Sequence, residues 1–178
     1  LERIRGELFE RDADSPEVQH LTAALFGKNL PRPPEGHVEE RFDDYADRID
    51  SHLAEQLNYQ VPILIESVLR NRFSTKKPAG MVWDLGCGTG LLGPRISDVC
   101  ESLLGVDLSA QMLLRAEQKK CYTNLVQSDL VSFFLHDARS FASPDAVVIA
   151  DTLVYLGDLQ PFFSALQPLL NPQSTVIF

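Results

Sequence analysis

The sequence at residues 82–90 is VWDLGCGTG, an apolar run that ends in an acid and continues into three glycines. Glycine adopts the positive φ angles of tight turns, and its missing side chain lets the backbone approach a ligand closely. A helical pattern follows the glycines, and the first turn of a helix has N–H groups that point toward a bound ligand. The stretch therefore predicts a strand, a turn and a helix that together bind a nucleotide-like ligand.

Two ligands compete for this turn, because residues 88–93 also match the G-x-G-x-x-G pattern of dinucleotide-binding proteins. Asp107 follows at nearly the distance at which that pattern places an acid for the ribose. Asp84 distinguishes the two ligands. A carboxylate at the strand end would repel a pyrophosphate but could hold the ammonium group of a methionine moiety, directly or through water. The charge of Asp84 therefore favours S-adenosylmethionine over NAD(P).

From Gly80 onward, short β-rich runs alternate with helical patterns, which is typical of βαβ units and a parallel sheet. We therefore predict an α/β fold. Strands are expected at residues 81–85, 102–106, 124–127, 145–149 and 174–178, and helices at 90–99, 109–119, 130–140 and 159–170.

The part of the chain before the sheet is predicted to be helical. Apolar residues spaced three and four apart from Phe42 to Leu57 indicate an amphipathic helix, and a second helix is expected to start at Pro62 and to run through Leu69. The expected division of the chain is a helical appendage with a proline-rich linker at 1–36 and one domain at 37–178, with a helical lead-in at 37–75 and a core at 80–178.

Acids follow several of the predicted strands, and the carboxyl ends of parallel strands meet at one edge of a sheet. Asp107, after the second strand, could accept hydrogen bonds from both ribose hydroxyls. Asp129, after the third, could accept one from an adenine amino group while Leu130 offers its backbone N–H, or it could cap the helix that starts beside it. After the fourth strand, Asp151 and Tyr155 are expected where a methyl donor and its acceptor would meet.

The combination of DLGCGTG, VDLS, SDL and DAVVIAD resembles the class I S-adenosylmethionine-dependent methyltransferases. The resemblance implies a Rossmann-like, doubly wound parallel sheet with strands in the order 3-2-1-4-5-7-6. This chain supplies five of them, so the expected order is 3-2-1-4-5, with the last two strands missing and the domain C-terminally incomplete. The implied cofactor is S-adenosylmethionine, with S-adenosylhomocysteine as the product. The implied cofactor-binding residues are Asp84, Gly86, Cys87, Gly88, Gly90, Asp107, Leu108, Ser109, Met112, Asp129, Leu130 and Asp151.

A narrower resemblance comes from residues 42–53 and 57–62, which look like the segment before the glycine motif in bacterial methyltransferases that carry tetratricopeptide repeats. In such families an aromatic side chain from this leading helix closes over the cofactor. That makes Tyr45 the cofactor-binding candidate here and Tyr59 a weaker one. The helix within residues 1–36 would then be the remnant of a repeat array.

The resemblance implies direct in-line transfer of a methyl group from a sulfonium, in which the protein mainly supplies alignment and a suitable electrostatic environment. Asp151 and Tyr155 are the catalytic candidates, and Asp151 could receive the proton that an amine or hydroxyl acceptor releases. Two alternatives remain open. One is a catalytically silent cofactor-binding or scaffold module, and the other is an NAD(P)-dependent oxidoreductase.

Composition narrows the classes of partner. The formal net charge of -9 disfavours nucleic acid as a substrate and leaves a small molecule as the expected acceptor. The sequence contains no apolar run that approaches the roughly twenty residues of a membrane span, so no contact with a membrane is expected. Three scattered cysteines predict free thiols and a cytoplasmic location, and the four histidines show no metal-ligand spacing, so no metal is expected. An apolar fifth strand at a sheet edge predicts self-association.

Overall fold

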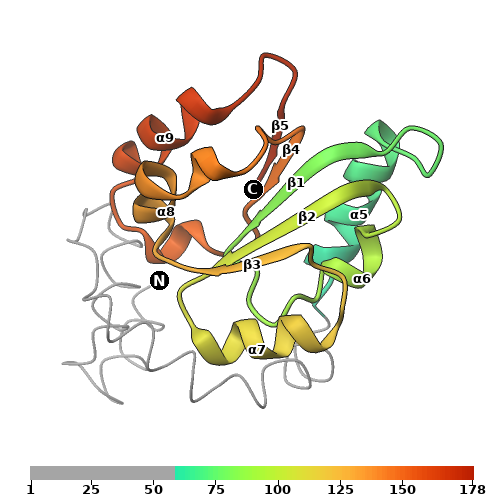
Figure 1. Ribbon diagram of the computed structural model, residues 1–178, viewed down its shortest axis with the longest axis horizontal. Helices are drawn as coiled ribbons and strands as arrows, with labels where there is room; N and C mark the ends of the chain where they lie inside the picture. The colour runs from blue at the N-terminus through green and yellow to red at the C-terminus, as the bar shows by residue number, and fades with distance from the viewer. Residues whose placement is uncertain (1–58) are drawn as a thin grey trace, which may run out of the picture.

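The computed structural model describes residues 59–178, which form a five-stranded parallel sheet with helices on both faces (Figure 1). The strand order is β3-β2-β1-β4-β5, and every neighbouring pair of strands is parallel. The predicted Rossmann-like α/β fold and the strand order 3-2-1-4-5 are therefore confirmed. The expected appendage at 1–36, the helix from Phe42 to Leu57 and Tyr45 lie outside the described residues.

All five expected strands are present; β3 has the predicted bounds, and the ends of the other strands differ from the prediction by at most two residues. Asp84 of β1 pairs with Gly105 of β2 on one side and with Val148 of β4 on the other, so the carboxyl ends of the central strands lie side by side. The strands are β1 at Ala79–Leu85, β2 at Cys100–Asp107, β3 at Asn124–Gln127, β4 at Ala146–Val148 and β5 at Thr175–Ile177.

The helices between the strands are shorter than the sequence pattern predicts, whereas α5 extends slightly beyond its predicted bounds. The helix expected at 90–99 is wrong in extent, because the turn continues to Leu92 and only Gly93–Ile96 is helical. The helix expected at 159–170 divides before Pro168, whose missing N–H cannot continue an α-helical ladder. The α-helices are α5 at Val61–Arg72, α6 at Gly93–Ile96, α7 at Ala110–Gln118, α8 at Leu130–His136 and α9 at Gln160–Leu166. Short 3₁₀ helices lie between these elements, with η1 at Ala138–Ser140, η2 at Leu153–Tyr155 and η3 at Gln167–Leu169.

Two apolar layers hold the helices against the sheet. Figure 1 shows α8 and α9 on one side of the sheet and α5 and α6 on the other. On the first side, Trp83 packs edge-on against Phe133, with ring centroids 5.5 Å apart. On the second side, Ile65 and Leu69 of α5 pack with Ile96 of α6 against the sheet. Among the helices of the described part of the chain, none combines the length and the apolarity needed to cross a membrane.

Alternation along β1 determines where its acid points. Successive side chains of a strand face opposite sides of the sheet. Trp83 and Leu85 belong to the core on the α8 and α9 side, whereas Val82 belongs to the core on the α5 and α6 side. Asp84 therefore faces the side of α5 and α6, where burial leaves it only 2% exposed.

Candidate cofactor-binding site

The glycine turn, defined as residues 86–90, follows β1 and is fixed to β2 by its backbone. The N–H groups of Gly86 and Cys87 both donate to Val106 O, at 2.7 Å and 3.1 Å. Gly86, Gly88 and Gly90 have positive φ angles of 74°, 54° and 78°. These are left-handed conformations that residues with a side chain rarely adopt, so the turn depends on glycine.

Gly88 is the point at which the turn faces open space. A side-chain carbon built on Gly88 would meet nothing within 4 Å, and the residue is half-buried. One built on Gly86 would instead overlap the side chain of Thr152, which follows β4. The open side of the turn therefore lies at Gly88, and the Gly86 end packs tightly against the loop after β4.

Asp107, at the end of β2, connects the turn to the start of α7. Its Oδ2 accepts a hydrogen bond from the Gly88 N–H at 2.8 Å, and its Oδ1 accepts one from the Ser109 N–H at 2.9 Å. These two bonds hold the carboxylate between the turn and the start of α7. The predicted ribose acid therefore lies next to the predicted glycine turn.

The predicted site residues that follow Asp107 differ in how deeply their side chains are buried. Ser109 is buried and caps α7, because its hydroxyl accepts a hydrogen bond from the Met112 N–H at 3.1 Å. Met112 is only 1% exposed, which places its side chain in the packed interior. Leu108 is half-buried between Asp107 and Ser109. Ser109 and Met112 thus have clear structural tasks beside the turn.

Asp84 has a partner that the sequence analysis missed. The Tyr122 hydroxyl donates to Asp84 Oδ2 at 2.7 Å from the connection between α7 and β3. Burial raises the pKa of the Asp84 carboxyl to about 6, and the nearby charge of Asp107 adds to this, while the hydrogen bond from Tyr122 opposes it. The acid therefore carries its charge at neutral pH in a buried position. Thirty-eight residues separate the two side chains, so no local pattern could have revealed the pair.

Burial also sets the state of Cys87 inside the turn. The thiol is buried, and desolvation raises its pKa well above the usual value, with the charges of Asp84 and Asp107 acting in the same direction. A protonated, buried thiol is a poor nucleophile. This agrees with Cys87 serving as a small packing residue of the turn.

The sequence left two roles open for Asp129, contact with adenine or capping of the next helix, and in the structure Asp129 caps α8. Its Oδ1 accepts hydrogen bonds from the N–H groups of Val131 and Ser132, at 3.1 Å and 3.0 Å. Leu130 is 5% exposed and belongs to the core on the α8 and α9 side. The cap accounts for one carboxylate oxygen and places the acid at the end of β3, on the same edge as Asp107.

Asp151 follows β4 in a strained conformation and is bound by Tyr59. Its φ angle is 50°, which is unusual for a residue other than glycine. The Tyr59 hydroxyl donates to Asp151 Oδ2 at 2.6 Å across 92 residues of sequence. Burial, followed by the bond to Asp151, raises the pKa of Tyr59, so the phenol stays protonated and remains a donor. The weaker aromatic candidate of the lead-in is thus brought to the loop after β4.

The loop after β4 also contains Thr152 and Tyr155. The Thr152 hydroxyl lies 2.9 Å from Ala150 O and 3.3 Å from Leu85 O, so it can donate to either and joins this loop to the end of β1. Tyr155 ends the short helix η2 and is 40% exposed. The structure therefore places Asp151 and Tyr155, the two predicted catalytic residues, in one loop beside the glycine turn.

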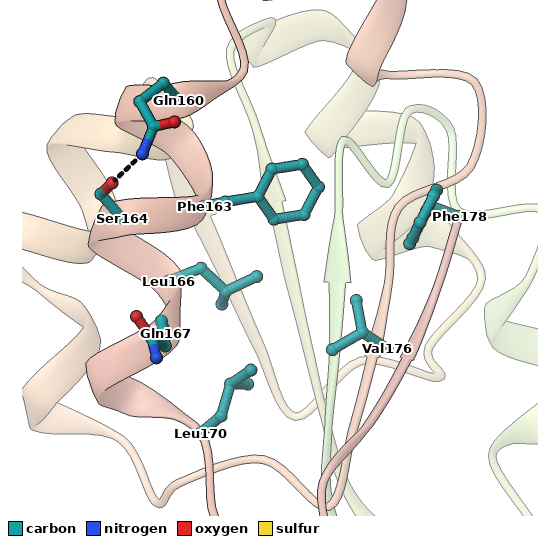
Figure 2. A pocket seen from close by; sticks show the side chains of 8 residues that line it. All are labelled: Gln160, Phe163, Ser164, Leu166, Gln167, Leu170, Val176 and Phe178. Atoms are coloured by element: carbon teal, nitrogen blue, oxygen red, sulfur yellow. Dashed lines mark hydrogen bonds between the residues drawn. The ribbon is translucent and has the colours of Figure 1, made fainter.

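A separate apolar groove lies beside β5 (Figure 2). It has a volume of about 350 Å³ and is bordered by α9, η3 and β5. Phe163, Leu170 and Val176 provide its apolar walls, and Phe178 at its end is 77% exposed. None of the residues that line it is among the predicted site residues, so the groove is distinct from the candidate cofactor site.

Comparison with known proteins identifies a family that matches this chain. Residues 83–176, more than half of the chain, match the family described as a methyltransferase domain. The chain is 30% identical over 107 residues to YqeM of Bacillus subtilis (strain 168), named as a methyltransferase. It is 28% identical over 98 residues to a protein of Acanthamoeba polyphaga mimivirus named as an RNA methyltransferase. These matches cover 56% and 53% of this chain but 41% and 25% of the two relatives, so the chain spans less than half of their length.

A solved structure shares the fold. The magnesium protoporphyrin IX methyltransferase ChlM from Synechocystis PCC 6803, with S-adenosylhomocysteine bound, superposes with a TM-score of 0.61 at 21% identity. The match covers 77% of this chain and 68% of that one, and the form of ChlM with bound S-adenosylmethionine matches at a TM-score of 0.60. At this level of identity the likeness concerns the fold.

Proposed function

Because the chain belongs to the methyltransferase domain family, the class I S-adenosylmethionine-dependent methyltransferases, we propose that it binds S-adenosylmethionine at the glycine turn and methylates a small-molecule acceptor. The observation that carries the proposal is the bond from the Gly88 N–H to Asp107 Oδ2 at 2.8 Å. It places an orienting acid directly beside the one position of the turn that faces open space. These residues fit a nucleoside whose ribose lies against the turn.

Each part of the cofactor has a proposed partner at this edge of the sheet. Asp107 binds the ribose hydroxyls, and Asp129 with the Leu130 N–H binds the adenine. Asp84 attracts the ammonium group of the methionine moiety, and its 2% exposure favours contact through a water molecule over direct contact. The proposed site also includes Gly86, Gly90, Leu108, Ser109, Asp151 and Tyr45, whereas the buried side chains of Cys87 and Met112 support it by packing.

The proposed chemistry needs little from the protein beyond placement. Bound S-adenosylmethionine supplies an electrophilic methyl group on a sulfonium, and an in-line attack by the acceptor breaks the carbon–sulfur bond as the new bond forms. Asp151 lies beyond β4, where Tyr59 orients its carboxylate. We propose that this carboxylate receives the proton that an amine or hydroxyl acceptor releases, while Tyr155 borders the acceptor.

A substitution tests the role of Asp151. The variant Asp151→Asn should keep the affinity for S-adenosylhomocysteine and lose most of the turnover, because an amide cannot take up the proton. Binding is measured by calorimetry, and turnover by the release of S-adenosylhomocysteine with a panel of amines and alcohols. Turnover in the variant equal to that of the original chain would show that Asp151 only lines the pocket.

The acceptor is proposed to be a small molecule on grounds of charge. With 25 acidic and 16 basic residues the chain repels a phosphate backbone, which argues against RNA although one relative is named as an RNA methyltransferase. ChlM, which shares the fold, is named for magnesium protoporphyrin IX. A negatively charged protein is better matched to neutral or cationic small acceptors than to polyanions.

Self-association through β5 is part of the proposal. In the part of the chain that the structure describes, β5 pairs only with β4, and the apolar groove of Figure 2 runs beside it. An open strand edge with neighbouring apolar side chains can pair with a second copy. Sedimentation at increasing concentration should therefore detect dimers, and Val176→Lys should reduce them. A monomer at every concentration would contradict this.

The proposal also covers the division of the chain into parts and its location in the cell. We propose that residues 1–36 are an appendage derived from tetratricopeptide repeats, and that 37–178 is the methyltransferase domain with its helical lead-in. Free thiols at Cys87, Cys100 and Cys121 support a cytoplasmic location, because an oxidising compartment favours paired cysteines.

The cofactor is tested first. Calorimetric titration with S-adenosylhomocysteine should give micromolar binding that Asp107→Ala abolishes, while NADH, the control ligand, should not bind. Binding of NADH instead would support the oxidoreductase alternative. Binding of S-adenosylhomocysteine without methylation across a broad acceptor panel would support the silent module.

A further inference from the structure

Tyr122, in the connection between α7 and β3, lies behind the glycine turn. A side-chain carbon built on Gly90 or on Gly93 would come within 2.8 Å of the Tyr122 ring, and one on Gly105 within 2.9 Å. Such distances are shorter than any normal carbon contact, so an alanine at any of the three positions would collide with the ring. One aromatic ring therefore lies against three glycines, and Leu125 shares the space at Gly105.

The hydroxyl of the same side chain reaches the acid at the end of β1. It donates to Asp84 Oδ2 at 2.7 Å, and Asp84 is 2% exposed. Asp84 lies two residues before Gly86, the first residue of the turn. Tyr122 thus makes two contacts near the turn: its ring lies against Gly90, and its hydroxyl donates to Asp84.

A second residue of this connection supports the same turn. The Lys119 ammonium donates to Thr89 O at 2.7 Å, and Thr89 lies between Gly88 and Gly90. The segment from Lys119 to Tyr122 therefore contacts the turn at Thr89 and Gly90, whereas a side-chain carbon built on Gly88 meets nothing within 4 Å. Neither contact follows from the glycine pattern.

We propose that Tyr122 is a positioning residue of the cofactor site, whose ring sets the shape of the glycine turn and whose hydroxyl fixes the Asp84 carboxylate. The inference rests on the proposed function, because there Asp84 attracts the ammonium group of the cofactor. Tyr122 itself is separated from the ligand by the turn and acts through Asp84 and the glycines.

The electrostatics of Asp84 make this role measurable. The pKa of Asp84 is raised to about 6, chiefly by burial, with the hydrogen bond from Tyr122 acting to lower it and the charge of Asp107 acting to raise it. Tyr59 and the Cys87 thiol also lie close enough to be influenced by the charge of Asp84, and both stay neutral because their own pKa values are raised. Without the Tyr122 hydroxyl, the pKa of Asp84 should rise and the carboxylate should lose its charge at a higher pH.

Two variants separate this role from simple packing. Tyr122→Phe removes the hydroxyl and keeps the ring. Thr123→Val is the matched control, because the Thr123 hydroxyl in the same connection accepts a hydrogen bond from the Leu103 backbone N–H at 3.2 Å and has no contact with Asp84. Each protein is titrated with S-adenosylhomocysteine from pH 5 to pH 9, and the Asp84 carboxyl carbon is followed by NMR without ligand, with Asp84→Asn to assign its signal.

The expected result is a shift in one midpoint. In the original chain and in Thr123→Val, affinity should fall below about pH 6 as Asp84 takes up a proton. In Tyr122→Phe the midpoint of both titrations should move up by about one pH unit, since a hydrogen bond to a charged group is lost. Asp84→Asn should bind with no midpoint between pH 5 and pH 8. A Tyr122→Phe midpoint equal to that of the original chain in the NMR titration would overturn the role of the hydroxyl.

The ring is tested by Tyr122→Leu. At pH 8.5, where Asp84 is charged in all variants, this change should weaken S-adenosylhomocysteine binding at least tenfold relative to Tyr122→Phe. Equal affinities would overturn the role of the ring. If the original chain fails to bind S-adenosylhomocysteine at all, the proposed function fails, whereas the ligand-free titration of Asp84 still decides whether Tyr122 holds the carboxylate.

Discussion

Gly86 and Gly88 lie two positions apart in the turn, yet different surroundings give them different tasks. An alanine at Gly86 would overlap Thr152 at a φ of 74°, whereas one at Gly88 would meet no protein atom within 4 Å. Gly86→Ala should therefore prevent folding or lower the free energy of unfolding by more than about 3 kcal/mol, because a clash with the Thr152 side chain adds to left-handed strain. Gly88→Ala should cost only about 1–2 kcal/mol from strain.

The same pair separates stability from binding. The methyl group of Gly88→Ala would project into the space proposed for the cofactor, so affinity for S-adenosylhomocysteine should fall at least tenfold in a protein that still folds. Urea unfolding and calorimetry measure the two effects. Equal losses of stability in the two variants would contradict the assignment of Gly88 as the open face of the turn.

Single residues show where sequence reasoning reaches its limit. The glycines and Asp107 could be predicted because one short motif contains the turn and one strand end contains the acid. Tyr122 and Asp84 come together across 38 residues, and Tyr59 and Asp151 across 92. Neither pair has a periodic or local signal, because tertiary packing alone brings the side chains together. The strain at Asp151 likewise follows from its place in the fold.

At the scale of elements, α5 fixes the lead-in to the sheet through one buried face. Leu69 is 1% exposed in the core on this side, whereas Leu64 on the same helix is 62% exposed. Leu69→Ala should lower the free energy of unfolding by about 2–5 kcal/mol, because it leaves a cavity. Leu64→Ala, the matched control, should change it by less than about 0.5 kcal/mol. Urea unfolding decides, and similar losses would mean that α5 buries a different face.

An ion-pair network continues the contact between α5 and α6. Arg70 pairs with Glu66 and with Asp98, and Glu66 also pairs with Arg95, each at 2.9 Å. All four side chains are partly or largely exposed, so they orient the two helices more than they stabilise the fold. The existence of α5 could be predicted from the sequence, but its buried face could not, because Leu64 and Val68 are apolar and exposed. The network could not be predicted either, since it joins residues from separate elements.

The lengths of the elements were harder to predict than their order. Alternating β and helical patterns determine the sequence of elements, and the parallel strand order was confirmed. The helix after the turn, α6, is only four residues long because the backbone leaves the turn late, at Leu92. Buried apolar residues lie at the end of α6, at Ile96, and beyond it, at Val99, and this spacing imitates a longer helix.

For the whole molecule, the buried charge of Asp84 should oppose stability at neutral pH. Its pKa of about 6 lies above the 3.8 of an unperturbed carboxyl, so between these values the folded state keeps a proton that the unfolded state releases. The contribution of Asp84 to stability is thus greatest below pH 4 and falls as pH rises to about 6. Two pH units correspond to about 3 kcal/mol.

Asp84→Asn tests this cost. The amide oxygen can still accept the Tyr122 hydroxyl, so the variant should be more stable than the original chain at pH 8, by up to about 3 kcal/mol, and the difference should shrink toward pH 4. Urea unfolding at pH 4, 6 and 8 measures it. A variant less stable than the original chain at pH 8 would mean that the carboxylate is compensated better than its burial indicates.

The ring of Tyr122 also has a consequence for how related sequences can change. Gly90, Gly93 and Gly105 all lie against that one ring, so a change at Tyr122 affects three glycines at once, although Ala116, Cys121 and Leu125 each crowd one of them as well. A mutation that enlarges one of these glycines needs a smaller side chain at position 122 and a shift of that second neighbour, which makes the order of substitutions matter. Two of these glycines belong to the G-x-G-x-x-G pattern at residues 88–93, so in this chain an internal tyrosine can maintain a pattern otherwise read as the imprint of a dinucleotide.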